Sequence, residues 1–365
     1  MKTIIMGDYT KWNKAVALLE RYRPDIIVIG CCDPYRGQLS GLFAAAYSMQ
    51  ETGDKYFKGE IDGVIVIDAS KRELNDFLNK CDIKNYAIPT KYYFMDSIDE
   101  QEIQTIVRSY GDIPAELSQI EFHLADHCNL NCAGCAHFSN IVPKPVFADY
   151  EQFVRDLTRL NELFEFISEF YLLGGEPLLN KDIDIFMQEL RKQMPHTQII
   201  VVTNGLLVLQ IKNELLDVFK KTKSRLSISN YNCLDTEKIK KFLDDSGIDY
   251  EIRYGRDYFA KYLTESNDGD INDIFDKCPN RRCHFLGKGE IAVCGQPFYI
   301  KYFNEYFNEK FSDRGAISLY DETDGNTILE KMSKPIEACR NCTYLVPTEW
   351  KVTDKVALKS DWIAR

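Results

Sequence analysis

The sequence predicts an α/β protein: an N-terminal Rossmann-like α/β domain at residues 1–112, a partial (β/α)6 TIM-like barrel at 115–275, and a small cysteine-rich domain at 276–350. Two observations lead to this fold class. Apolar runs alternate with amphipathic segments through the first two regions, which is the pattern of parallel strands joined by crossover helices. Beyond residue 275, cysteine, glycine and aromatic residues replace that alternation, and residues 351–365 form a tail.

The N-terminal region alternates strands with helices. Strands are predicted at residues 2–6, 25–30, 62–68 and 86–89. Apolar residues at helical spacing predict two helices, one through Trp12, Ala15, Leu18, Leu19 and Tyr22 and one through Leu74, Phe77 and Leu78. Gly7, Asp8 and Tyr9 follow the first strand, where a nucleotide phosphate could lie, but G-x-G-x-x-G is missing. We therefore favour a structural or partner-binding role for this domain.

The central region repeats strand and helix more regularly. Five strands are predicted, at residues 119–124, 171–173, 198–203, 226–229 and 250–253. A capping box at Asp149 and Gln152 begins the first helix, whose apolar face carries Phe153, Leu157, Leu160, Phe164 and Ile167. Further helices are expected through Ile183, Phe186 and Leu190, and at 211–222 and 235–243. In such folds the chemistry takes place at the C-terminal ends of the strands.

Composition narrows the range of partners. The chain has 365 residues, of which 45% are hydrophobic, and its net charge is −11. A phosphate backbone requires a basic face, so nucleic acid is not expected as a partner. The most apolar stretch, residues 39–49, is too short to span a bilayer, and the N-terminal apolar run is too short for a signal peptide. We expect a cytoplasmic protein.

Twelve cysteines are the unusual feature of this composition. A reducing compartment keeps thiols free, so clustered cysteines there more often bind metal than form disulfides. The first cluster is Cys128-x-x-x-Cys132-x-x-Cys135, on the loop after a predicted barrel strand. Three thiolates can bind three irons of a 4Fe–4S cluster and leave the fourth iron open. The alternative is zinc, with His127 or His137 as the fourth ligand.

Two turns follow at the ends of the next two predicted strands. The first is Gly174-Gly175-Glu176-Pro177, whose glycines would let a ligand approach the backbone and whose carboxylate could accept from an ammonium group. The second is Thr203-Asn204-Gly205. Each alone is typical of an ordinary turn. Three motifs at three consecutive strand ends are much harder to attribute to chance.

Together these three motifs resemble the radical S-adenosylmethionine superfamily over residues 115–275. The resemblance implies that Cys128, Cys132 and Cys135 hold a catalytic 4Fe–4S cluster, whose open iron is chelated by S-adenosylmethionine. It assigns the amino group of that cofactor to Gly174, Gly175 and Glu176, and its ribose and carboxylate to Thr203, Asn204, Ser227 and Ser229. Many members have an aromatic residue where this chain has Gly134, so His137 or Phe138 would contact the adenine instead.

The second cysteine group is spaced as Cys278-x10-Gly289-x4-Cys294, followed by Cys339-x-x-Cys342. Four thiolates close a 4Fe–4S cluster with no open position. The pattern resembles the Twitch domain, the shortened form of the SPASM domain, and implies one auxiliary cluster, with Cys283 as a possible substitute for Cys278. A structural four-cysteine zinc site is the alternative.

The remaining features have simpler expectations. The spare thiols at Cys31, Cys32 and Cys81 are expected to pack in the core, whereas Cys233 or Cys283 could donate a hydrogen atom to a substrate radical. A helix with an aromatic face is predicted from Phe298, Tyr299, Tyr302, Phe303, Tyr306 and Phe307. The acidic residues from Asp268 to Asp273 are expected to form a solvated connection.

The resemblance implies a radical S-adenosylmethionine enzyme that abstracts hydrogen from a small polar substrate. Twitch-type relatives favour a carbohydrate-related substrate that is oxidised or epimerised, free or carrier-linked. An electron donor such as flavodoxin or ferredoxin would be the protein partner. The alternatives are a peptide-modifying maturase and, from another class, a non-enzymatic iron–sulfur or zinc protein, for which the two turns have no evident use.

Overall fold

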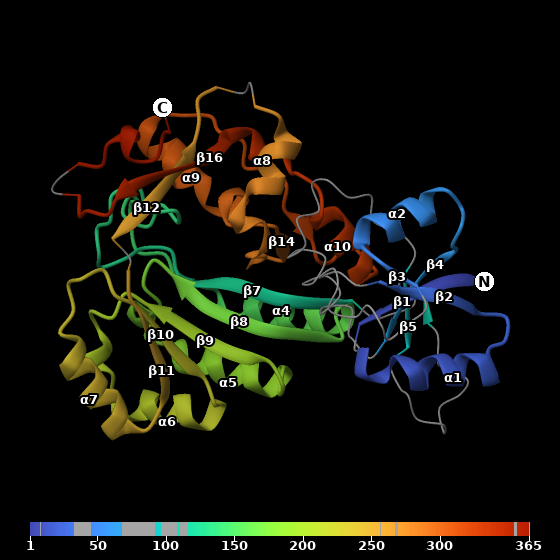
Figure 1. The fold of residues 1–365 in the computed structure, drawn as a ribbon. Coiled ribbons are helices and arrows are strands. Elements are labelled where there is room, and N and C mark those ends of the chain that lie inside the picture. Colours follow the sequence, from blue (N-terminus) through green and yellow to red (C-terminus); the bar gives the residue numbers. More distant parts are fainter. Residues whose placement is uncertain are drawn as a thin grey trace. The chain divides into compact units, whose positions relative to one another are not determined.

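The computed structural model describes most of the chain (Figure 1). The described residues are 1–7, 9–32, 45–67, 92–95, 108–109, 115–255, 257–266, 269–353 and 356–364. They divide into two compact units, Met1–Glu116 and Leu117–Arg365. The predictions for residues 74–78, 86–89, Asp8, Cys81 and Asp268 lie outside the described part.

The first unit contains a small, mostly parallel sheet. Its strands run in the order β3-β2-β1-β4-β5-β6, which is the order of doubly wound α/β sheets. Every neighbouring pair is parallel except β5 and β6. The strands are β1 (Lys2–Gly7), β2 (Ile27–Cys32), β3 (Ala46–Tyr47), β4 (Gly63–Ile67), β5 (Tyr92–Met95) and β6 (Arg108–Ser109). The predicted N-terminal α/β sheet is therefore confirmed.

Two helices are described in this unit, α1 (Trp12–Tyr22) and α2 (Met49–Phe57). Of these two helices only α1 was predicted from the sequence, although α2 begins with a complete capping box. The Ser48 hydroxyl accepts from the Glu51 backbone N–H at 3.2 Å, and the Glu51 carboxylate accepts from the Ser48 N–H at 2.8 Å. Cys31 and Cys32 are fully buried in the core, as expected.

The second unit is built on an eight-stranded sheet in the order β11-β10-β9-β8-β7-β13-β14-β15. Its strands β8 to β11 are parallel to their neighbours, and β13 is parallel to β7. The bounds are β7 (Glu116–Ala125), β8 (Phe166–Gly174), β9 (Gln198–Thr203), β10 (Arg225–Ser229), β11 (Asp249–Arg253), β13 (Phe285–Gly287), β14 (Glu290–Ala292) and β15 (Ile317–Ser318). All five strands predicted for the central region are present.

The count of six βα units differs from what the structure shows. After β11 the chain leaves the sheet and forms β12 (Tyr258–Leu263), which pairs antiparallel with β16 (Cys342–Glu349). The place beside β7 is instead taken by β13, which enters from the cysteine-rich region as one arm of an antiparallel hairpin with β14. The sixth parallel strand is therefore supplied by a distant segment, which no local pattern in the barrel region could indicate.

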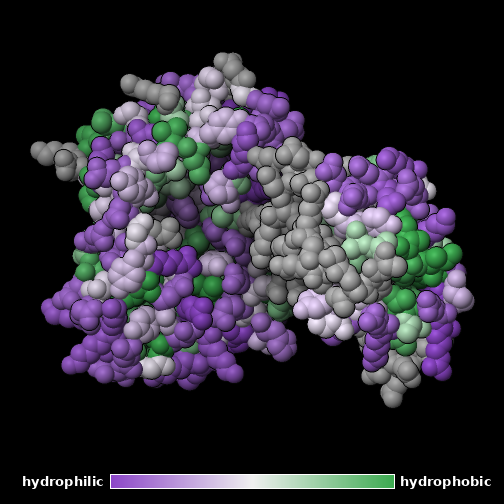
Figure 2. Space-filling model, in the orientation of Figure 1, coloured by the Kyte–Doolittle hydropathy of each residue, from purple (hydrophilic) through white to green (hydrophobic). Residues whose placement is uncertain are grey.

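Four helices cover one face of this sheet: α4 (Tyr150–Leu163), α5 (Ile183–Gln193), α6 (Asn213–Thr222) and α7 (Thr236–Ser246) (Figure 1). Their outward surface is predominantly hydrophilic (Figure 2). The predicted first helix was too long, because α4 ends at Leu163 and Ile167 already belongs to β8. The capping box is half formed, because Asp149 accepts from the Gln152 N–H while the Gln152 side chain donates to Asp156.

The opposite face of the sheet is turned toward the C-terminal elements (Figure 1). These are the β12–β16 ribbon, α8 (Ile271–Lys277), α9 (Gln296–Phe307) and α10 (Gly325–Met332). The predicted aromatic helix is α9, and its Tyr299, Tyr302 and Phe303 are buried. The acidic connection is partly helical, since α8 begins at Ile271 with Asp270 as its N-cap. None of the described helices is long and apolar enough to cross a membrane.

Candidate active site

The three mid-chain cysteines lie on the loop between β7 and α4. The charges of Cys128 and Cys135 both act on Cys132, so the three thiols are close together. Burial raises the pKa of Cys128 and of Cys132 to about 12 and also raises that of Cys135. Because only the thiolate binds metal, a metal centre bound here would displace the three thiol protons, which would be released to solvent.

N–H groups are directed at each of the three sulfurs. Cys128 Sγ accepts from the backbone of Leu130 at 3.3 Å and from Asn204 Nδ2 at 3.4 Å. Cys132 Sγ accepts from the Trp350 indole at 3.2 Å, and Cys135 interacts with the backbone N–H groups that follow it. Such donors stabilise the thiolates that hold an iron–sulfur cluster. The donor set therefore fits the predicted cluster.

The zinc alternative receives less support. Within the described residues, no three His, Cys, Asp or Glu side chains converge on one metal position. A cubane does not need such convergence, because its three thiolates bind three different irons. In both histidines proposed as the fourth ligand Nδ1 has a partner, so only Nε2 could bind zinc: His127 Nδ1 lies 3.2 Å from the Val146 backbone, and His137 Nδ1 lies 2.7 Å from His123 Nε2.

The Gly-Gly pair lies directly against the strand end that leads into the cysteine loop. The Gly175 N–H donates to the Ala125 carbonyl at 2.8 Å, and the Glu176 N–H donates to the His127 carbonyl at 3.1 Å. A Cβ on Gly174 would collide with the Ala125 oxygen, and one on Gly175 would collide with the His127 oxygen. Only glycine allows β8 to approach the cysteine loop this closely.

Glu176 joins the two turns. Its carboxylate is fully buried and accepts from Thr203 Oγ1 at 2.7 Å, from the Asn204 N–H at 2.9 Å and from the Leu178 N–H at 3.1 Å. Burial raises the pKa of Glu176 to about 7. The Thr203 hydroxyl thus donates its proton within the protein, and little of the carboxylate remains for an ammonium group. We infer that Glu176 mainly positions the two turns.

Asn204 completes the link between the three motifs. Its side chain donates to Cys128 Sγ and, at 2.8 Å, to Asn129 Oδ1. The ends of β7, β8 and β9 are therefore connected by hydrogen bonds through side chains that the sequence had singled out. Ser227 and Ser229 lie on the next strand, β10, and both are buried. Ser227 Oγ donates to Glu251 Oε1 at 2.7 Å.

A set of polar side chains on one face of the parallel strands was not predicted from the sequence. Tyr171 donates to Glu169 at 2.8 Å, and Arg253 Nε donates to Glu251 at 2.7 Å. These residues alternate along their strands with apolar residues that pack against the helices, such as Phe170. This alternation of polar and apolar residues is the sequence pattern that could have indicated a polar face of the sheet. In Figure 2 the surface is hollowed between the strands β7 and β8 and the helix α9.

A buried polar chain beside the cysteine loop was also missed. His123 Nδ1 lies 3.0 Å from Asp126 Oδ1, His123 Nε2 bonds to His137, and the Tyr302 hydroxyl from α9 donates to Asp126. Burial lowers the pKa of His123 and lowers that of His137 to about 3, so both imidazoles are neutral. Phe138, which was considered with His137 for an adenine contact, is fully buried in the core.

The C-terminal cysteines also come together. Burial raises the pKa of Cys342 well above its ordinary value, and the charges of Cys294, Cys339 and Cys278 raise it further. Cys283 interacts electrostatically with Glu121 as well as with Cys294 and Cys278. Of Cys278 and Cys283, only Cys278 acts on Cys342 and Cys339, which supports the prediction that Cys278 is the fourth ligand.

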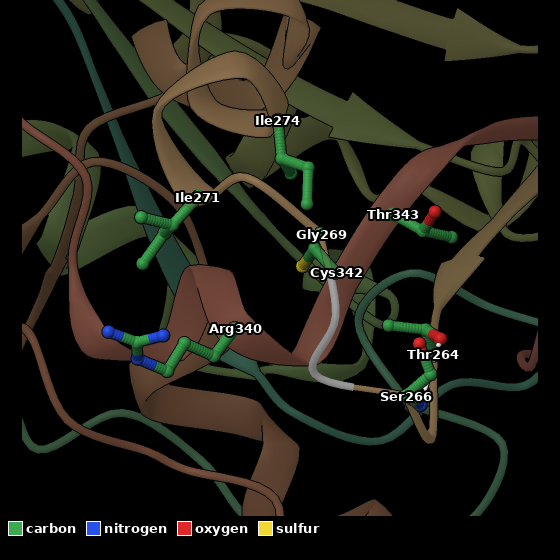
Figure 3. A pocket seen from close by; sticks show the side chains of 8 residues that line it. All are labelled: Thr264, Ser266, Gly269, Ile271, Ile274, Arg340, Cys342 and Thr343. Carbon is green, nitrogen blue, oxygen red and sulfur yellow. Dashed lines mark hydrogen bonds between the residues drawn. The ribbon is translucent and has the colours of Figure 1, made fainter.

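A small pocket adjoins this group at the junction of α8 and β16 (Figure 3). It is lined by Thr264, Ser266, Gly269, Ile271, Ile274, Arg340, Cys342 and Thr343. All of these residues follow β11, and none belongs to the parallel strands that carry the three motifs.

Comparison with known families gives a direct match. Residues 123–244 match the model of the Radical SAM superfamily, a segment that contains all three motifs. Over that segment the chain matches this superfamily. The match does not include the first unit or the C-terminal cysteines.

Curated relatives cover only parts of the chain. They include the GTP 3′,8-cyclases of Nautilia profundicola, 29% identical over 110 residues, and Campylobacter curvus, 26% identical over 160 residues. The molybdenum cofactor biosynthesis protein moc-5 of Caenorhabditis elegans is 26% identical over 197 residues. These alignments span 28%, 41% and 49% of this chain and 32%, 44% and 32% of the respective relatives.

Solved structures show a more distant likeness. BtrN in complex with AdoMet and 2-DOIA is 16% identical, with a TM-score of 0.39, over 64% of this chain and 95% of its own. Streptococcus suis SuiB bound to its precursor peptide SuiA is 18% identical, with a TM-score of 0.30, over 46% of this chain and 38% of its own.

Proposed function

We propose that this protein is an enzyme that uses S-adenosylmethionine and a 4Fe–4S cluster held by Cys128, Cys132 and Cys135 to abstract hydrogen from a small polar substrate. One observation carries the proposal: the cysteine loop, the Gly-Gly-Glu turn and the Thr-Asn turn form one hydrogen-bonded unit at the ends of β7, β8 and β9. This unit lies inside the segment that matches the superfamily. An electron carrier would have no need of it.

The cluster, when bound, would supply an electron that cleaves S-adenosylmethionine to a 5′-deoxyadenosyl radical. The protein supplies ligation and orientation. Its three cysteines leave one iron without a protein ligand, and the backbone of Gly174 and Gly175 forms the adjacent edge of the site. Glu176 fixes that edge to the Thr203–Asn204 turn. No side chain needs to act as an acid or base in this step.

The polar face of the sheet supports our choice of substrate class. Tyr171 donates to Glu169 there, and Ser227 and Arg253 both donate to Glu251. Such groups suit a ligand with several hydroxyl or amino groups, because each can exchange an internal hydrogen bond for one to the ligand. We therefore favour a carbohydrate-related substrate, oxidised or epimerised, with a flavodoxin or ferredoxin as electron donor.

We further propose that Cys278, Cys294, Cys339 and Cys342 hold an auxiliary 4Fe–4S cluster. Cys294, Cys339 and Cys278 all act electrostatically on Cys342, and Cys294 and Cys278 receive backbone N–H groups from the residues that follow them. Four thiolates leave no open position, which suits electron transfer rather than substrate binding.

Anaerobic reconstitution tests both proposals. Two cubanes require about eight irons and eight sulfides per chain. The reduced protein should form 5′-deoxyadenosine from S-adenosylmethionine, and the triple variant C128A/C132A/C135A should form none while keeping about four irons. Full iron loading without 5′-deoxyadenosine would favour the electron carrier. Zinc at the C-terminal site would exclude the auxiliary cluster.

A further inference from the structure

The last residues of the chain pack along the catalytic cysteine loop. We call residues 350–353 and 356–363 the C-terminal strap. The Ala133 N–H donates to the Lys351 carbonyl at 2.9 Å, and the Thr353 N–H donates to the Asn131 carbonyl at 2.7 Å. Cys132 itself forms a β-bridge with Val352. The strap therefore pairs with the loop on both sides of one cysteine ligand, although more than two hundred residues separate them in sequence.

Trp350 is the strap residue that reaches a sulfur. Its indole N–H donates to Cys132 Sγ at 3.2 Å. Its ring stacks on Tyr231, with centroids 5.3 Å apart and planes at 18°, and its backbone N–H donates to the Asp257 carbonyl at 2.7 Å. The ring stacking and the backbone hydrogen bond together hold the Trp350 indole in the orientation that directs its N–H at Cys132 Sγ.

A second tryptophan attaches the strap at its other end. Trp362 is 1% exposed, and its indole N–H donates to the Cys135 carbonyl at 2.8 Å. Gly134 has a left-handed φ of +68°, and a Cβ there would lie 2.5 Å from the Asp361 carbonyl oxygen. The strap backbone therefore contacts the loop backbone directly and leaves no space for a side chain at residue 134. Unlike Trp350, Trp362 donates to a carbonyl and not to a sulfur.

We propose that Trp350 is a positioning residue that raises the reduction potential of the cluster bound at Cys128, Cys132 and Cys135. This inference rests on the proposed function. Reduction adds negative charge to a cluster and its thiolates, and an N–H donor stabilises that charge more in the reduced state than in the oxidised state. The cluster without the indole N–H is therefore harder to reduce.

The test compares W350F with W362F in the full-length, anaerobically reconstituted protein. Phenylalanine keeps an aromatic ring beside Tyr231 but lacks the N–H donor, and W362F makes the same change in ring size while removing an indole N–H that does not reach sulfur. Iron is counted, and the reduction potential is measured by a redox titration followed by electron paramagnetic resonance. The signal of the catalytic cluster is recognised as the one that added S-adenosylmethionine changes.

We expect W350F to keep its iron and to shift this potential to more negative values, and W362F to leave the potential unchanged. A wild-type potential in iron-loaded W350F overturns the proposal. If W350F binds little iron, W350H is measured in the same way, because histidine restores an N–H group at this position. Recovery of the iron content and of the reduction potential in W350H supports the proposal. Equally low iron content in both variants overturns it. Wild-type protein without a catalytic cluster would instead refute the proposed function.

Discussion

At the scale of single residues, burial and hydrogen bonding give several side chains roles that their position in the sequence did not reveal. Glu176 was singled out as a ligand for an ammonium group, yet its carboxylate accepts three hydrogen bonds from its own chain. Cys283 was weighed as a substitute metal ligand, yet burial and the nearby Glu121 carboxylate raise the pKa of its thiol. In both cases the partner is distant in sequence, so residue type and spacing could not identify it.

Glu176 predicts a pH dependence of stability in the iron-free protein. Its pKa is raised from 4.5 to about 7. A raised folded-state pKa means that its stabilising contribution is present below pH 4.5 and is lost as pH rises through 7. For this shift the loss is about 3 kcal/mol. E176Q should therefore show a smaller decrease in unfolding free energy between pH 5 and pH 8, measured in urea.

The control for this measurement is E189Q, because the exposed partners of Glu189 lower its pKa. That variant should keep the wild-type pH dependence over the same range. An E176Q curve parallel to that of the wild type would show that Glu176 is already ionised at pH 5.

The ligand set of the auxiliary site gives a second residue-scale prediction. C283S should keep about eight irons per chain, whereas C278S should lose up to four, because only Cys278 acts electrostatically on both Cys339 and Cys342. Iron and sulfide counts after anaerobic reconstitution measure the difference. Loss of iron in C283S alone would show that Cys283, and not Cys278, is the fourth ligand.

At the scale of elements, periodicity located most helices and strands of the second unit, because each must bury one face against its neighbour. The errors lie where local pattern and tertiary packing disagree. Ile167 continued the helical spacing of α4, but the chain turns at Phe164 and Ile167 is buried in β8. The strand β8 was predicted as three residues, and it extends from Phe166 to Gly174.

The close contact of β8 with the cysteine loop predicts a large effect of one methyl group. G175A places a Cβ against the His127 carbonyl, and backbone atoms cannot move aside easily. We expect a loss of stability of about 2–4 kcal/mol and much weaker binding of S-adenosylmethionine. Chemical denaturation and equilibrium dialysis measure the two effects.

Gly255 provides the matched control. Its φ is +74° and no atom lies within 4 Å of a Cβ built there, so G255A meets only backbone strain. That strain costs about 1–2 kcal/mol, and cofactor binding should be unchanged. Equal losses of stability and binding in the two variants would refute the steric explanation.

At the scale of the whole molecule, the loop of Cys128, Cys132 and Cys135 is packed against residues outside the segment that matches the superfamily. That segment ends at residue 244, whereas the strap begins at Trp350. The buried core around Phe138 also includes Phe303 from α9 and Trp362 from the strap. The radical SAM segment and the C-terminal elements thus form one packed unit, Leu117–Arg365.

Removal of the strap should therefore damage the catalytic site selectively. A chain ending at Glu349 keeps the β12–β16 ribbon and the four C-terminal cysteines but loses every contact of Trp350, Lys351 and Trp362. We expect about four irons to remain and 5′-deoxyadenosine formation to fall at least tenfold. A truncated protein with full iron and wild-type activity would show that the strap is dispensable.

The α/β class, the five central strands and the grouping of the three motifs at strand ends could be predicted from the sequence, because strand and helix periodicity and cysteine spacing are local properties of a chain. Three features are visible only in the folded chain: β13 pairs with β7, Glu176 accepts hydrogen bonds from the neighbouring turn, and residues 350–363 pack along the cysteine loop. These features depend on which distant surfaces bury each other, and such pairing leaves no periodic or spacing signal in either partner.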